Sequence, residues 1–345
     1  MAAFDRAPTE AARLLSRPPE EGARLLALAF LDQAAAARPR LDDPEDGEAL
    51  HDFRVALRRL RSCLKAYLDD LGDSVPRKLA RRLRRLADAT GAGRDAEVQI
   101  AWLRGEGRPL AAVHRPGHVW LLARLAARKR DAYGEIALEV ADEFAAVERD
   151  LRRRLSVYRT EVRLDRDLPR RTLGATAAEI LDAQAAELAV HLGRVDGPGA
   201  ETAAHQARIR AKRLRYLLEP FREEVPAAAP VVQRIKALQD LLGELHDAHV
   251  LEDEITRALA QAAAARAARL LELTLHDAPD DKLLRAERRR RHEPGLLALA
   301  KRNRDRRDRL YAELAQAWLD GRAGDFLALG WLAEALTAAG AAGGG

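Results

Sequence analysis

Hydrophobic residues recur every three to four positions along most of the chain, with charged residues between them. Leu79, Leu83 and Leu86, for example, follow one another at intervals of four and three residues among arginines. This spacing places the three leucines on one face of an α-helix, because a helix turns once in about 3.6 residues. Stretches with the two-residue alternation of a β-strand are few. The pattern therefore predicts an all-α protein.

Prolines lie between the periodic stretches, where a proline ends or starts a helix. They are Pro76, Pro116, Pro169, Pro198, Pro226, Pro230 and Pro294. Residues 193–199 include Asp196-Gly197-Pro198, which is typical of a turn. The placement of these residues indicates helical bundles.

One basic segment occurs twice along the chain. It begins at His51 with the sequence HDFRVALRRLR and returns at His205 as HQARIRAKRLR. Four basic side chains follow each histidine in the same register: Arg54, Arg58, Arg59 and Arg61, then Arg208, Lys212, Arg213 and Arg215. On a helix, offsets 0, +3, +7 and +10 fall within about 80° of arc. Lys65 extends this stripe in the first copy, and Arg59 and Arg213 lie on its flank.

Two further blocks are shared by the two halves of the chain. Asp88, Gly91, Asp95 and Val98 match Asp240, Gly243, Asp247 and Val250 at an offset of 152 residues. Pro116-Gly117, Arg124, Arg128 and Tyr133 match Pro294-Gly295, Arg302, Arg306 and Tyr311 at an offset of 178 residues. Ordered blocks in both halves predict an internal duplication. We place the repeats at residues 21–170 and 171–335, with a polar lead-in at 1–20 and a flexible tail at 336–345.

Basic residues are gathered in short segments although the whole chain is nearly balanced in charge. The formal net charge is +5, from 59 Lys and Arg against 54 Asp and Glu. Residues 51–65 nevertheless contain a single carboxylate, Asp52, and residues 78–85 contain none. Like charges stacked along one helix face repel one another unless an anion neutralises them. The segregation favours a defined anion site over a general nucleic-acid coat.

An arginine-rich helix can also be a solvated surface without a ligand. That interpretation does not require the register that the two motifs share, so we favour an anion site for the motif helices. The runs Arg152-Arg153-Arg154 and Glu287–Arg291 have no counterpart in the other half, and there we expect solvated faces.

The second shared block places Arg84, Asp88, Gly91 and Asp95 on one helix face, and Lys236, Asp240, Gly243 and Asp247 repeat that arrangement. Glycine allows a close helix approach, at a cost of about 1 kcal/mol relative to alanine. The carboxylates are suited to hold neighbouring basic side chains in place. A catalytic carboxylate pair is the alternative, but no metal-ligand pattern accompanies these residues.

His51 and His205 are compatible with four roles: contact with an anion, acceptance of a phosphoryl group, metal binding or a buried structural position. The chain contains neither His-x-x-x-His nor His-x-x-Glu-His, so we expect no metal. Hydrogen bonding to an anion, with the ring oriented by a neighbouring acid, fits the basic surroundings best. The buried structural role stays open.

Several absences restrict the protein class. No apolar run approaches the roughly 18 residues needed to span a bilayer, and the N-terminal segment lacks the apolar region of a secretion signal. A single cysteine, Cys63, excludes an intrachain disulfide framework and a cysteine metal cluster. We therefore expect a cytoplasmic protein with neither a cofactor nor a membrane partner.

The two His-x-x-Arg-x-x-x-Arg/Lys-Arg-Leu-Arg segments resemble those of the CHAD family, a histidine-bearing α-helical domain of bacteria and archaea. The sequence Leu242-Gly243-Glu244-Leu245-His246-Asp247 also matches the family pattern, whereas Thr90-Gly91-Ala92-Gly93-Arg94-Asp95 departs from it in repeat 1. The resemblance implies two antiparallel four-helix bundles, related by a pseudo-twofold axis around a central basic cavity. It also implies binding of inorganic polyphosphate and association with polyphosphate granules.

The CYTH tunnel domain that often accompanies this family begins with a Glu-x-Glu-x-Lys strand, which is absent here. We therefore expect a stand-alone module.

Inorganic polyphosphate suits this composition, because it offers dense negative charge and no bases to stack. Arginine binds phosphate oxygens in a bidentate manner and lysine adds point charge, whereas binders of single-stranded nucleic acid also need exposed aromatic rings. Aromatic residues make up only 4% of this chain. The predicted binding residues are His51, Arg54, Arg58, Arg59, Arg61, Lys65, Arg84, Arg128, His205, Arg208, Lys212, Arg213, Arg215, Lys236 and Arg306.

We expect a non-enzymatic binder of polyphosphate. One alternative is a phosphohydrolase or phosphotransferase that uses His51 or His205 on polyphosphate or nucleoside triphosphates. The other alternative is a nucleic-acid-binding scaffold protein.

Overall fold

A computed structural model describes residues 13–43, 46, 48–105, 110–157, 171–275, 281–289 and 291–342; for residues 73, 92, 135–139 and 141 it describes the backbone alone. Every regular element in these ranges is a helix, which confirms the predicted all-α class. The predicted boundary between the repeats adjoins residues 158–170, which lie outside the described residues, as does Pro169.

Repeat 1 contains five long helices, joined by the short helix α3 (Leu68–Leu71) and by turns of 3-10 helix. The long helices are α1 (Pro19–Ala37), α2 (Ala49–Ala66), α4 (Arg77–Ala89), α5 (Gly91–Gly105) and α6 (Arg115–Leu155). The 3-10 turns are η2 (Pro39–Asp42), η3 (Gly72–Ser74) and η4 (Ala112–His114). Pro76 precedes α4 and Pro116 lies in the first turn of α6, as the sequence predicted.

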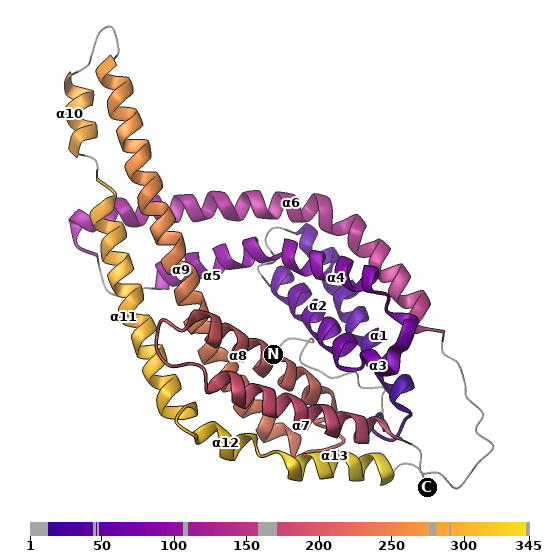
Figure 1. The fold of residues 1–345 in the computed structure, drawn as a ribbon. Helices are drawn as coiled ribbons and strands as arrows, with labels where there is room; N and C mark the ends of the chain where they lie inside the picture. Colours follow the sequence, from indigo (N-terminus) through magenta and orange to yellow (C-terminus); the bar gives the residue numbers. More distant parts are fainter. Residues whose placement is uncertain are drawn as a thin grey trace.

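Repeat 2 continues with α7 (Leu173–Leu192), α8 (Glu201–Leu218), η5 (Glu219–Phe221), α9 (Ala228–Leu275), α10 (Asp281–Arg289), α11 (Glu293–Trp318), α12 (Arg322–Leu327) and α13 (Gly330–Ala342). The two repeats interrupt different helices (Figure 1). In repeat 1 the helix of the second shared block ends near Thr90. In repeat 2 the corresponding helix, α9, is 48 residues long and has no break at the equivalent position. Repeat 2 instead interrupts its last helix at Asp320 and Gly321, which both have positive φ angles.

One hydrophobic core runs through both repeats. It includes the buried faces of α1, α2, α7 and α8, where Leu31, Leu57, Leu181 and Leu214 are fully buried. A second core joins α5, α6, α9 and α11 through residues such as Leu121 and Leu251 (Figure 1). The repeats are therefore joined at two separate places.

The helices α6 and α11 cross at a pair of glycines. A Cβ atom on Gly117 would lie 2.2 Å from the His292 carbonyl oxygen and 2.8 Å from the Cα atom of Gly295. A Cβ atom on Gly295 would lie 2.2 Å from the His114 carbonyl oxygen and 2.9 Å from the Cα atom of Gly117. Equivalent positions of the two repeats thus contact each other.

The predicted close helix approach at Gly91 and Gly243 is wrong. The nearest atoms to a Cβ at these positions are Arg54 Nη1 and Arg208 Nε, each at 3.9 Å, and no backbone atom of another described helix lies within 4 Å. These glycines lie beside the motif arginines, and Gly117 and Gly295 provide the close helix approach instead.

The two ends of the chain are more closely packed than the sequence suggested. Leu14 and Leu15 are buried, and their backbone N–H groups donate to Glu224 at 3.0 and 3.2 Å. Leu336 is fully buried because α13 packs against α7. Residues 336–342 thus belong to the helical fold rather than to a flexible tail; residues 1–12 and 343–345 lie outside the described residues.

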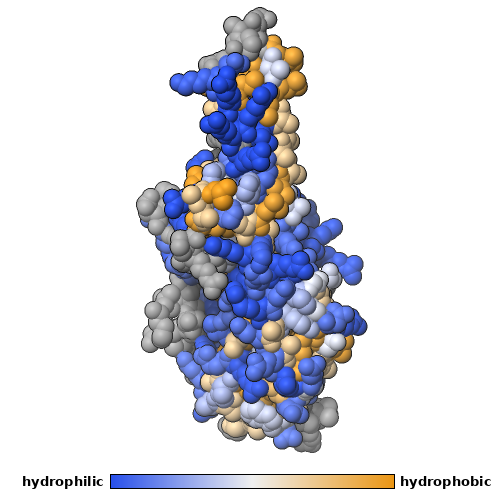
Figure 2. All heavy atoms as spheres, turned by 90° about the vertical axis from the view of Figure 1, so that its left-hand side faces the viewer, coloured by the Kyte–Doolittle hydropathy of each residue, from blue (hydrophilic) through white to orange (hydrophobic). Residues whose placement is uncertain are grey.

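The end of α9 and α10 together form an arm that extends from the rest of the molecule (Figure 1). The arm carries a hydrophobic edge beside a hydrophilic face (Figure 2). Leu271, Leu275 and Leu283 are exposed on it, and Arg288 and Arg289 are exposed as expected for a solvated arginine run.

Candidate anion-binding site between the motif helices

The two motif helices contact each other, and their basic stripes meet. The helix α2 buries Phe53 and Leu57, and α8 buries Ala207 and Leu214, at the apolar positions between the basic ones. Arg58 of α2 is an electrostatic neighbour of both Arg208 and Lys212 of α8, and Arg54 is also a neighbour of Arg208. We refer to Arg54, Arg58, Arg208 and Lys212 as the basic cluster.

None of the four side chains in the basic cluster forms an ion pair with a carboxylate of the described residues. Arg54 donates from Nη1 to Thr90 Oγ1 at 2.9 Å and to the Ala87 carbonyl at 3.3 Å. The Nε atoms of Arg58 and Arg208 are buried without a hydrogen-bond partner. Burial of an unpaired cation is unfavourable, so the cluster is suited to receive an anion.

The pKa values in the basic cluster reflect this unfavourable burial. Desolvation, followed by the charge of Arg58, lowers the pKa of Arg54 to about 10. Desolvation also lowers the pKa of Lys212 well below its ordinary value, and Arg208 and Arg58 lower it further. Asp247 favours the charged form of Lys212, but it lies beyond ion-pair distance and its own pKa is raised by burial. The carboxylate thus offsets the cluster's charge only in part.

The motif histidines lie at the head of the basic cluster. Desolvation and nearby cations lower the pKa of His51 and of His205. The ring of His246 lies 4.8 Å from that of His205, and its pKa is lowered to about 3, mainly by burial. The Nδ1 atoms of His205 and His246 are buried without a hydrogen-bond partner. These rings therefore present unused polar atoms next to the cations.

The acid expected to orient the motif histidines does not do so in the described residues. Asp52, the carboxylate next to His51, accepts from Arg40 at 2.6 Å instead. In repeat 2 the ring of His205 packs beside that of His246, and Glu201 favours its charged form without a hydrogen bond among the described residues.

A second group of cations lies further along the motif helices. Lys65 is an electrostatic neighbour of Arg213 and Arg210, and Arg213 is a neighbour of Arg61. Desolvation lowers the pKa of Arg61, Lys65 and Arg213, none of which pairs with a described carboxylate. Arg210, which was not among the predicted residues, pairs with Glu187 at 3.1 Å. We refer to Arg61, Lys65 and Arg213 as the outer cations.

The remaining predicted cations are all paired with carboxylates. Arg59 and Arg215 share Glu219, at 3.1 and 3.2 Å. Arg128 contacts the buried Glu254 at 2.9 Å, and Arg306 contacts Glu244 at 3.2 Å. The exposed Arg84 and Lys236 pair with Asp88 and Asp240 one turn away on their own helices, as the second block predicted. These six residues are less suited to bind an anion than the basic cluster is.

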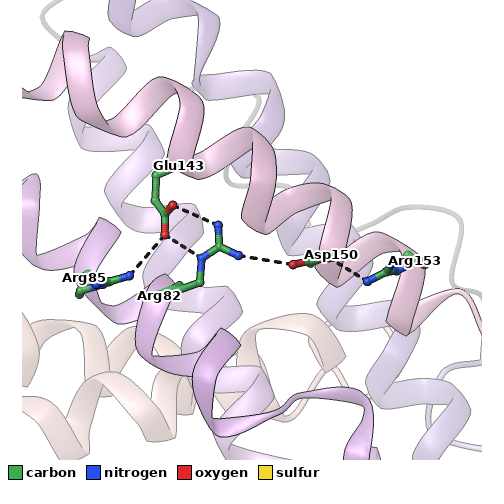
Figure 3. Close-up of polar contacts among 5 residues, drawn as sticks. All are labelled: Arg82, Arg85, Glu143, Asp150 and Arg153. Carbon is green, nitrogen blue, oxygen red and sulfur yellow. Dashed lines mark hydrogen bonds and ion pairs between the residues drawn. The ribbon is translucent and has the colours of Figure 1, made fainter.

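Acids from another helix also neutralise the basic run at residues 78–85. Figure 3 shows Arg82 of α4 between Glu143 and Asp150 of α6, with distances of 2.8 and 3.4 Å. Arg85 lies 3.7 Å from the same Glu143. Segregation of charge along the sequence therefore does not persist in space at this run.

Arg94 and His246 also lie near the basic cluster, although they were not among the residues predicted from the sequence. Arg94 is an electrostatic neighbour of His51 and Arg54, and His246 is a neighbour of His205 and Arg208. Both occupy the same position of the second shared block, one residue before Asp95 and Asp247. Their equivalent positions in the shared block could have identified both residues from the sequence.

The described part of the chain was also searched for metal sites and for membrane-spanning helices. No three His, Cys, Asp or Glu side chains gather there in a group that could hold a metal ion. No helix there has the length and apolar composition needed to cross a membrane.

Comparison with known proteins bears on the family and the fold. The family model of the CHAD domain matches residues 25–256, which include both motif helices. The chain belongs to the CHAD domain family. A crystal structure of the CHAD domain from the plant Ricinus communis has the same fold, with a TM-score of 0.58 and 21% sequence identity, over 79% of this chain and 92% of that chain. No curated protein matches this CHAD chain.

Proposed function

We propose that this CHAD protein binds inorganic polyphosphate, without chemical turnover, between helices α2 and α8. The observation that carries the proposal is the basic cluster, in which Arg58, Arg208 and Lys212 are partly buried, the Nε atoms of both arginines are fully buried, and none of the three has a carboxylate partner among the described residues. A polyanion would supply the missing negative charge, and arginine forks match phosphate oxygens. The outer cations extend the same surface along the two helices.

The aromatic residues favour polyphosphate over single-stranded nucleic acid. Base stacking needs exposed rings, but Phe53, Tyr67 and Tyr216, which lie on or next to the motif helices, are buried. Tyr216 is also covered by the guanidinium of Arg215, at 4.9 Å from the ring centre. The surface thus offers charge without stacking platforms. We expect the protein to associate with polyphosphate granules in the cytoplasm for the same reason.

The test compares two double charge reversals by mobility shift or filter binding with long-chain polyphosphate. The first, Arg58→Glu/Lys212→Glu, removes the centre of the basic cluster. We expect its affinity to fall about 100-fold, from two lost charge-assisted contacts of roughly 1.5 kcal/mol each. The matched control, Arg84→Glu/Lys236→Glu, changes the net charge equally at exposed, paired positions of the same two repeats. It should lose no more than about threefold, because exposed charges are screened by salt.

Two further measurements separate the alternatives. Release of phosphate from polyphosphate or nucleoside triphosphates, with and without Mg²⁺, would identify an enzyme instead of a binder. Competition by single-stranded DNA at physiological salt would identify a nucleic-acid partner. Equal affinity of Arg58→Glu/Lys212→Glu and the parent protein would contradict the site.

A further inference from the structure

A hollow of about 660 Å³ lies between α5 and α6 of repeat 1. Its lining includes Arg94, Glu97, Arg104, Lys129, Arg130 and Tyr133, together with small apolar residues. The proposed binding residues do not include any of these side chains. The hollow is therefore a second surface whose role the basic cluster does not explain.

Arg94 connects the hollow to the basic cluster. It lines the hollow, and it is also an electrostatic neighbour of His51 and Arg54 on the motif helix. Arg94 therefore lies between the basic cluster and the hollow, where it could contact a phosphate chain that extends from one to the other.

The hollow retains free positive charge. Glu97 takes up part of the charge, because it accepts hydrogen bonds from Tyr133, Lys129 and Arg94, the last at 3.2 Å. Burial raises the pKa of Glu97, but these hydrogen bonds outweigh it and lower the pKa overall. Arg104 and Arg130, by contrast, are exposed and form no ion pair with a described residue. They are the cations that remain available to a ligand.

The equivalent surface of repeat 2 has lost this charge. The lining of the hollow has four basic residues and one acidic residue. The offsets of 152 and 178 residues assign it the counterparts His246, His249, Val250, Glu252, Asp253, Thr256, Arg304, Arg307, Asp308 and Tyr311. These include two basic and three acidic residues, and Arg307 is paired with Glu252 at 2.6 Å. A polyanion would be attracted on the side of repeat 1 and repelled on the side of repeat 2.

We propose that a long polyphosphate chain leaves the basic cluster on one side only, past Arg94 into the hollow between α5 and α6, where Arg104 and Arg130 bind its next phosphates. This inference rests on the proposed function. It assigns the hollow to a continuing inorganic polyanion and gives the chain a single direction of exit. A chain too short to reach the hollow gains nothing from it.

The experiment measures the affinity of Arg104→Glu/Arg130→Glu for long-chain polyphosphate and for tripolyphosphate at physiological salt. We expect the affinity for the long chain to fall about tenfold and its dependence on log[salt] to become shallower by about 1.5, at roughly 0.7–0.9 per lost phosphate contact. The affinity for tripolyphosphate should stay within about twofold, because charges beyond the Debye length of about 8 Å are largely screened. Unchanged binding of tripolyphosphate also shows that the variant is folded.

The matched control is Arg304→Glu/Arg309→Glu. Both arginines are exposed on α11, neither pairs with a described residue, and the change in net charge is the same. The control should bind the long chain like the parent protein. Equal losses in the two variants, or an equal loss of tripolyphosphate binding in Arg104→Glu/Arg130→Glu, overturn the one-sided exit while the proposed function stands. A parent protein that binds neither ligand overturns both.

Discussion

Two arginine-rich regions of this protein differ in whether a carboxylate lies at ion-pair distance from the basic side chains. Around the fully buried Glu254, which is 1% exposed, three guanidinium groups gather: those of Arg124 and Arg128 at 2.9 Å and of Arg257 at 3.0 Å. In the basic cluster, Arg58, Arg208 and Lys212 gather with no carboxylate of the described residues at ion-pair distance. The first region thus has an internal carboxylate that its arginines share, and the second has none at ion-pair distance among the described residues.

Basic residues at helical spacing therefore do not by themselves form an anion site. Arg128 and Arg58 were equally good candidates in the sequence, since both recur in the other repeat. Their difference lies in what packs against them. We therefore expect substitutions around Glu254 to change stability, and substitutions in the basic cluster to change binding.

The largest expected effect is that of Glu254→Ala. This change leaves three guanidinium groups without their shared acceptor, at a cost of about 3 kcal/mol in the free energy of unfolding, since a broken buried pair costs roughly 3–5 kcal/mol and these arginines are partly exposed. Urea denaturation measures it. Affinity for polyphosphate should stay within about twofold of the parent protein, because the basic cluster is untouched.

The control for this change is Glu252→Ala, which removes a carboxylate that is 43% exposed from Arg307. It should cost less than about 1 kcal/mol, as exposed ion pairs do. If the two variants are equally stable, Glu254 does not organise its three arginines as described.

The sequence predicted the basic cluster better than it predicted its surroundings. The spacing of apolar and basic positions placed Arg54, Arg58, Arg208 and Lys212 on facing stripes, because the helical period alone determines which side chains share a face. It could not show that Arg59 pairs with Glu219, 160 residues away, or Arg128 with Glu254, 126 residues away. Such contacts depend on which helices pack together.

Some of the missed detail did have a local signal. Arg215 and Glu219 are four residues apart, a spacing that favours an ion pair on a helix. The departure of repeat 1 from the family pattern at Thr90 marks the place where its helix breaks. Thr90 is fully buried there and accepts from Arg54 at 2.9 Å, so the break helps to position a motif arginine. The break in the last helix of repeat 2, at Asp320 and Gly321, had no counterpart in repeat 1 to compare with.

The next largest effect is expected for Lys212→Met, which should change stability and binding in opposite directions. Methionine has nearly the same length as lysine but no charge, so the substitution removes a partly buried ammonium, which pairs with no described carboxylate, from beside Arg208 and Arg58. We expect the free energy of unfolding to rise by about 1 kcal/mol, because well-packed apolar replacements of buried charge are often stabilising. Affinity for polyphosphate should fall about tenfold, which corresponds to roughly 1.4 kcal/mol.

Lys236→Met provides the matched comparison. Lys236 is exposed and pairs with Asp240 at 2.6 Å, so its replacement should leave both quantities nearly unchanged. A loss of stability in Lys212→Met would show that the charge of Lys212 stabilises the protein without a ligand. The basic cluster would then not differ from the region around Glu254 in this respect.

The smallest effect is expected from pH, through the histidines that lie beside the basic cluster. His51 faces Arg94 and Arg58, with Glu48 and Asp52 acting in the opposite sense; His205 faces Arg208 and Lys212, opposed by Glu201. His246 faces Arg208, His205, Lys212 and His249. The lowered pKa values mean that the folded protein binds fewer protons than the unfolded chain. The free energy of unfolding should therefore be highest above about pH 6.5, the ordinary histidine pKa, and should fall as the pH decreases below it.

Binding of polyphosphate should raise the pKa values of these histidines, because a polyanion beside the rings favours their protonated form. The affinity is expected to rise about threefold between roughly pH 7.5 and pH 5.5. Long chains are the suitable ligand, since only their terminal phosphates titrate in this range. His205→Asn/His246→Asn should lose most of this gain, whereas His114→Asn/His292→Asn, changed at the crossing of α6 and α11, should keep it. The same pH dependence in all three proteins would assign the effect to groups outside the basic cluster.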